Sequence, residues 1–109
     1  NSKRLAGEEG IDAMLKEHEL DLLIAPTTSP SWKIDRVNGD NYSGSASSPA
    51  AVAGYPHITV PMGYIQIGEE PALPVGLSFF STAKAEPVLI EAAFAYEQAT
   101  KHRKAPQFD

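Results

Sequence analysis

The chain of 109 residues is 42% hydrophobic and 21% charged, which is typical of one globular domain and disfavours a disordered chain. Nine Lys and Arg against 14 Asp and Glu give a net charge of −5, which disfavours a surface that binds nucleic acid phosphates. The absence of cysteine excludes disulfides, thiolate metal sites and cysteine nucleophiles.

The charged residues are unevenly spread along the chain. Nine of them lie between Lys3 and Asp21, whereas residues 41–83 contain only Glu69 and Glu70. A free-standing domain of this size buries about two-thirds of the surface that its unfolded chain exposes, so a long segment normally shows charged side chains to water. Prolines interrupt residues 41–83, which excludes a membrane helix there. We therefore expect other protein to cover this stretch, and residues 1–109 to be a single segment of a larger protein.

Residues 2–18 have the pattern of an amphipathic helix. Apolar positions and one histidine recur at helical spacing, namely Ile11, Met14, Leu15 and His18. Residues 20–25 follow as a nearly continuous apolar run that Pro26 closes. Such a run predicts a strand buried on both faces, in a sheet with parallel character.

Residues 26–48 form a long loop rich in Thr, Ser, Asn and Gly, and they include the single tryptophan, Trp32. Loops of this length without secondary structure are generally functional or disordered. A short helix is predicted over residues 47–54, because Ser48 can cap it, Pro49 suits its first turn and Gly54 can end it.

The second half of the chain predicts strands and then a helix. Residues 58–60 predict a short strand that Pro61 stops, and residues 64–67 and 74–80 flank a turn and predict a hairpin. The last helix is predicted from about Glu86 to Arg103. It is apolar on two sides, one containing Leu89 and Ala93 and the other Ile90 and Phe94, so we expect it to pack between two layers.

Two groups of residues suggest catalysis, and each has a simpler interpretation. Ser81 and Lys84 have the Ser-x-x-Lys spacing of some serine hydrolases, but Ser81 or Thr82 can equally cap the last helix. The hydroxyl-rich residues 43–48 lack the glycines of a nucleophile elbow. The histidines lie on three different elements, so we expect no metal site.

The loop of residues 26–48 is the better candidate for a site. It leaves the C-terminal end of the predicted strand, where open α/β sheets bind their ligands. Trp32 can wall a pocket there, with Asp35, Arg36 and Asp40 as polar partners. The alternative is a surface loop whose tryptophan packs on a neighbouring element.

Four motifs together resemble a known family. They cover nearly the whole chain in order: Asp21-Leu-Leu-Ile-Ala-Pro-Thr27, Pro49-Ala-Ala-Val-Ala-Gly-Tyr-Pro56, His57-Ile-Thr-Val-Pro-Met-Gly63 and Leu73-Pro-Val-Gly-Leu-Ser-Phe-Phe80. With the Ala-rich helix that follows, they resemble the C-terminal portion of the amidase signature enzymes. The resemblance implies an α/β fold in which helices flank a mixed β-sheet.

The resemblance also implies an activity and its location. Amidase signature enzymes hydrolyse a carboxylic amide to an acid and ammonia or amine through a Ser–cis-Ser–Lys triad, without metal or organic cofactor. That triad belongs to the N-terminal portion of the family, so the resemblance assigns no catalytic residue to this chain. At the places where glutaminase-type amidotransferase subunits usually have an acidic residue and Asn-Leu-Ala-Gly, this chain has Gly44 and Ala51-Val-Ala-Gly54, which favours a stand-alone amidase.

We therefore expect an amidase segment that supplies core strands, a helix and part of a substrate-pocket wall, and that is inactive alone. The pocket residues would be Thr28, Trp32 and Asp40, and the substrate a small-molecule amide. The expected partner is the N-terminal catalytic part of the same enzyme, with self-association of the segment alone. The lack of cysteine and of a signal-peptide pattern fits a cytoplasmic protein. The alternative is a non-catalytic binding or regulatory module that folds by itself.

Overall fold

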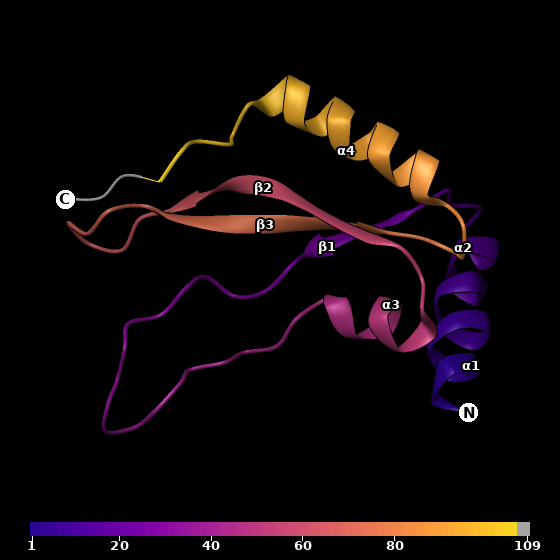
Figure 1. The fold of residues 1–109 in the computed structure, drawn as a ribbon, viewed down its shortest axis with the longest axis horizontal. Helices are drawn as coiled ribbons and strands as arrows, with labels where there is room; N and C mark the ends of the chain where they lie inside the picture. Colours follow the sequence, from indigo (N-terminus) through magenta and orange to yellow (C-terminus); the bar gives the residue numbers. More distant parts are fainter. Residues whose placement is uncertain (107–109) are drawn as a thin grey trace.

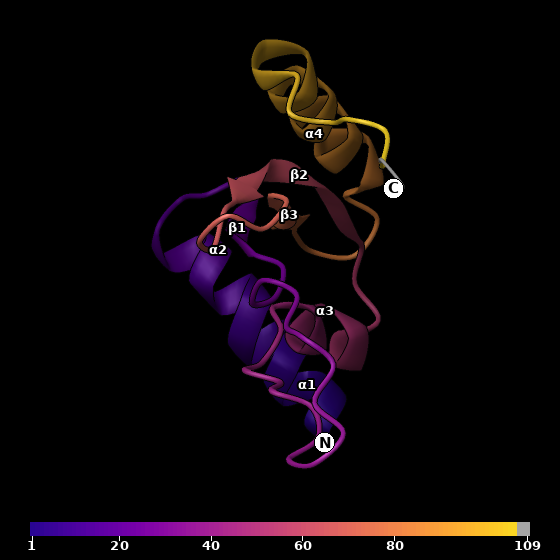
Figure 2. The same cartoon turned by 90° about the vertical axis from the view of Figure 1, so that its left-hand side faces the viewer.

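A computed structural model describes residues 1–106, which form three layers. One helix covers one face of a three-stranded sheet, and the other helices lie on the opposite side (Figures 1 and 2). The elements in chain order are α1 (Ser2–Ala6), the π-helical turn η1 (Gly7–Asp12), α2 (Ala13–Glu17), β1 (Leu23–Pro26), α3 (Ser47–Ala53), β2 (His57–Ile65), β3 (Leu73–Phe80) and α4 (Glu86–Thr100).

The sheet has the strand order β1-β3-β2, and both pairs of strands are antiparallel. Within residues 1–106, the parallel character and the double burial predicted for residues 20–25 are not observed. Burial alternates along β1, and the side chain of Ile24 is 60% exposed. β1 is an edge strand of the described sheet, and residues 1–106 leave the face that carries Ile24 open.

β2 is longer than its prolines suggest. The sequence pattern predicts that Pro61 stops a short strand, but β2 continues to Ile65 and joins two apolar runs that the pattern assigns to separate strands. Proline is tolerated because β2 lies at the edge of the sheet, and the register with β3 shifts between Pro61 and Gly63. The predicted hairpin with β3 is confirmed, with Leu73 opposite Ile65.

The helical segment at the start of the chain is confirmed, but its buried face is only partly as predicted. Ile11 and Leu15 are buried, whereas Met14 and His18 are exposed. The segment also contains the π-helical turn η1, so its residues do not follow α-helical periodicity throughout. Gly7 lies in this turn, and a Cβ there would come within 2.8 Å of the Tyr55 hydroxyl.

The short helix α3 begins and ends through backbone geometry. Ser48 does not cap it, because the helix already begins at Ser47 and the hydroxyl of Ser45 accepts a hydrogen bond from the Ser47 amide at 3.1 Å. Gly54 ends it as predicted, with φ of +76°, and its amide donates to the Ala50 carbonyl. Ala50 and Ala53 face inward and pack on the first helical segment.

The last helix, α4, packs on β2 and β3 with one face (Figure 1). Leu89 is 2% exposed in a core cluster whose other members are Val60, Leu77, Phe79 and Ala93. The helix ends at Thr100 and not at Arg103, because Lys101 adopts φ of +50°. Ile90 and Phe94 are 60% and 63% exposed on the far side, so only one of the two predicted apolar faces is covered by residues 1–106.

The segment is flat and exposes much surface. Its solvent-accessible area is 8046 Å², against about 5,900 Å² expected for a compact monomer of its mass. Its radius of gyration is 16.2 Å, against about 13 Å for a compact domain of this length. Within residues 1–106, no helix combines the length and the apolar character that crossing a bilayer requires.

Candidate functional site

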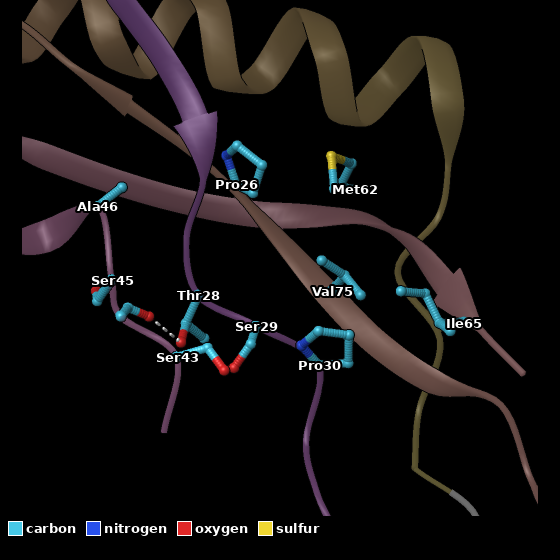
Figure 3. Close-up of a pocket in the computed structure, with 11 residues that line it drawn as sticks. Pro26, Thr28, Ser29, Pro30, Ser43, Ser45, Ala46, Met62, Ile65 and Val75 are labelled. Carbon is cyan, nitrogen blue, oxygen red and sulfur yellow. Dashed lines mark hydrogen bonds between the residues drawn. The ribbon is translucent and has the colours of Figure 1, made fainter. Parts of the chain in front are cut away.

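A groove of about 540 Å³ lies beyond the end of β1, between the two arms of the loop of residues 27–46 and the sheet (Figure 3). The loop contributes Pro30 and a row of hydroxyls, and the sheet contributes apolar side chains. The hydroxyls belong to Thr28, Ser29, Ser43 and Ser45. The apolar side chains belong to Pro26, Met62, Ile65 and Val75.

Main-chain contacts hold the two arms of the loop together. Thr28 and Ser45 form an isolated antiparallel bridge, and the Ala46 amide donates to the Thr27 carbonyl at 2.9 Å. The Thr28 hydroxyl also donates to the Gly44 carbonyl at 2.8 Å, as the dashed line in Figure 3 shows. Gly44 has φ of +109°, a conformation that favours glycine. The inner end of the groove is therefore built on a fixed backbone.

Three hydroxyls lie side by side across the sheet next to this groove. Ser78 on β3 is fully buried, and its Oγ lies 2.7 Å from Thr27 Oγ1 and 3.4 Å from Thr59 Oγ1. Gly76 makes room for them, because a Cβ there would lie 2.8 Å from both Thr27 Oγ1 and Thr59 Cγ2. Sequence reasoning missed this row, because its members lie on three separate segments whose register no local pattern reveals.

The three predicted pocket residues lie in two places. Thr28 lines the groove, whereas Trp32 lies farther along the loop and lines a second hollow. The Trp32 indole N–H points to Asp40, with Nε1 3.5 Å from Oδ1, so these two residues are brought together. None of these contacts tests whether a substrate binds the three residues, so their assignment remains a prediction.

Asp35, which the sequence suggests as a polar partner in the pocket, bonds within its own turn. Its carboxylate accepts hydrogen bonds from the Asn38 amide at 2.9 Å, from Asn38 Nδ2 at 2.8 Å and from the Val37 amide at 2.8 Å. The bonds from Asn38, and then that from Val37, hold the pKa of Asp35 below its usual value. The carboxylate therefore fixes the tip of the loop.

The Ser81–Lys84 pair has no catalytic geometry. The Ser81 hydroxyl is buried and donates to the Asp21 carbonyl at 2.7 Å, while Lys84 is exposed with φ of +64°. Neither Ser81 nor Thr82 caps α4, whose first residue follows Ala85. In the described part of the chain, the Ser and Thr hydroxyls that form hydrogen bonds pair with other hydroxyls or with main-chain groups.

Titratable side chains are sparse around the groove. Among residues 1–106, no three His, Asp or Glu side chains converge as a metal site would require. The Nε2 atom of His57 is buried and has no hydrogen-bond partner among residues 1–106. The His57 ring stacks on the ring of Phe80, with 5.9 Å between the two centroids. The groove can therefore bind through hydroxyls and apolar contact, but the residues that line it include no nucleophile with an adjacent base.

Several known proteins are similar to this chain in sequence. No family model matches the chain. It is 37% identical over 99 residues to a probable amidase of Arabidopsis thaliana, a match that covers 91% of the chain and 15% of the plant protein. It is 34% identical over 102 residues to a glutamyl-tRNA(Gln) amidotransferase subunit of Oceanobacillus iheyensis, covering 88% of the chain and 20% of the bacterial protein.

Solved structures agree with these sequence matches. The native peptide amidase from Stenotrophomonas maltophilia matches 99% of the chain with a TM-score of 0.85 and 54% identity. The chain covers 20% of that structure, so it spans a fifth or less of the length of these three relatives.

The order of strands and helices, together with the sequence likeness, defines a segment of an α/β amidase fold. The chain belongs to the amidase signature family, and it corresponds to the C-terminal portion of that fold, as its motifs predict. The predicted fold class is thereby confirmed, although the strands within this segment pair only in antiparallel fashion across residues 1–106.

Proposed function

We propose that this chain is the C-terminal segment of an amidase that hydrolyses a carboxylic amide to an acid and ammonia or amine. The observation that carries the proposal is its 54% identity to a peptide amidase over 99% of the chain, with a TM-score of 0.85. The identity to the amidotransferase is 34%, which favours a stand-alone amidase over a tRNA-dependent enzyme.

The substrate class follows from the same likeness. Since the similar structure is a peptide amidase, we propose that the substrate is the amide of a short peptide. The groove suits such a molecule, because its hydroxyls can bond to peptide N–H and C=O groups while Met62, Ile65 and Val75 contact apolar side chains. Thr28 would then contribute to the wall of the substrate pocket.

The catalytic groups would be supplied by the rest of the enzyme. The family mechanism uses a Ser–cis-Ser–Lys triad and an acyl-enzyme, and we assign no member of the triad to residues 1–109. Exposed apolar surface supports a covering partner. A second groove of about 660 Å³ is lined by exposed Leu5, Met14, Ile24 and Val52, which a neighbouring part of an amidase would bury.

Ammonia release tests this proposal. The enzyme that carries this segment is incubated with short peptide amides, and the free 109-residue chain is assayed in parallel. We expect the enzyme to release ammonia and the free chain to release none. Failure of the enzyme to hydrolyse any amide would overturn the activity. Hydrolysis by the free chain would overturn the location of the triad.

A further inference from the structure

An outer compartment of about 530 Å³ lies next to the groove. Ser29, Pro30 and Ser43 line both spaces, so the two adjoin at these residues. The Ser29 hydroxyl is buried and has no hydrogen-bond partner among residues 1–106. A buried hydroxyl without a partner is costly, so a polar group of a ligand at this junction would relieve that cost.

The outer compartment has apolar walls from both sides. Pro30 and Trp32 come from the loop, while Ile67 and Leu73 come from the end of the β2–β3 hairpin. The indole N–H of Trp32 is directed at Asp40, so its flat apolar ring remains available for stacking. An aromatic or aliphatic group is therefore the ligand chemistry that these walls fit.

One ion pair connects the two walls. Lys33 Nζ pairs with Glu70 Oε1, joining the residue after Trp32 to the β2–β3 turn. The hydrogen bond to Glu70 raises the pKa of Lys33, because this bond favours the charged amine. Because these two charges neutralise each other, the pair gives the compartment no excess charge with which to recognise an ion.

We propose that this outer compartment is a specificity pocket for an apolar side chain of the peptide amide, with Trp32 as the residue that contacts it. Lys33 and Glu70 act as positioning residues that hold the Trp32 side of the loop against the hairpin. The inference rests on the proposed function, because it assumes that the groove holds the substrate. Beyond that function, the inference states which substrate side chains the enzyme prefers and which residues cause the preference.

The test uses the enzyme that carries this segment and a series of short peptide amides in which phenylalanine replaces alanine at one position at a time. At one position, we expect the preference for phenylalanine, expressed as a ratio of kcat/KM values, to fall roughly three- to tenfold in Trp32→Ala. Trp32→Phe should keep most of the preference because an aromatic ring remains. Tyr42→Ala is the matched control, since Tyr42 is an exposed aromatic residue of the same loop outside both spaces.

The ion pair is tested by charge exchange. Glu70→Lys alone should lower the same preference, and adding Lys33→Glu should restore it, because the pair is re-formed with its charges reversed. A Trp32→Ala enzyme that loses activity equally on the alanine and phenylalanine series would overturn the inference. Absence of hydrolysis by the unaltered enzyme would instead overturn the proposed function, so the two failures are distinguishable.

Discussion

At the scale of single residues, the close approach of Thr27, Thr59 and Ser78 depends on a missing side chain. Gly76 allows Thr27 and Thr59 to approach Ser78, whose hydroxyl is fully buried. A buried hydroxyl needs partners, and here they are provided by the segments on either side of β3. The row of hydroxyls therefore fixes the place where the loop leaves β1, and with it the inner wall of the groove.

We expect Gly76→Ala to destabilise the protein by roughly 1–3 kcal/mol, because the added methyl group overlaps two threonine side chains. Denaturant unfolding of the full-length enzyme measures the change. Gly63→Ala is the matched control in the partner strand, where an added Cβ meets nothing within 4 Å. Equal losses in the two variants would show that close packing at Gly76 is not the cause.

At the scale of elements, helix α3, the hairpin and α4 could be predicted from the sequence because their signals are local. Gly54 ends α3, and the turn after residue 67 separates two apolar runs. Other features depend on distant partners. Pro61 argues against a strand until its place at a sheet edge is known, and sequence periodicity does not reveal the π-helical turn η1.

In the candidate site too, features with local sequence signals could be predicted, whereas contacts between distant residues could not. The sequence indicated the loop and Trp32, because a long loop after a strand is a common place for a ligand. It could not indicate the pairing of Thr28 with Ser45, nor the link from Lys33 to Glu70, since both join residues that are far apart in the chain. The sequence also could not show that Asp35 bonds within its own turn, because a turn-forming aspartate and a pocket aspartate look alike in sequence.

Helix α4 allows a prediction about its two faces. Leu89→Ala should cost about 2–5 kcal/mol, because Leu89 is buried against the sheet. Ile90→Ala should cost about 2 kcal/mol in the full-length enzyme as well, although Ile90 is exposed here, because the proposed partner would cover it. Unfolding of the full-length enzyme measures both, with Glu91→Ala as the exposed control. A loss below about 0.5 kcal/mol at Ile90 would mean that nothing covers this face.

At the scale of the whole molecule, the uneven charge distribution has a structural counterpart. The chain exposes about 2,000 Å² more than a compact monomer of its mass. This excess is larger than the area of about 800 Å² that each partner buries in a typical stable interface. β1 and β2 are edge strands of the described sheet, and Ile24 on β1 lines the second groove. This surface argues against a module that folds by itself and for a segment that other protein covers.

The free 109-residue chain should therefore bind a hydrophobic dye and self-associate, because its apolar surface has no other cover. Analytical ultracentrifugation and dye fluorescence measure this. Combining Ile90→Lys with Phe94→Glu should reduce the association by placing charge on the open face of α4, whereas Glu91→Gln, also exposed on that helix, should not. A free chain that sediments as a compact monomer and unfolds cooperatively would contradict the covered-segment interpretation, since a self-folding module needs no partner to bury Ile90 and Phe94.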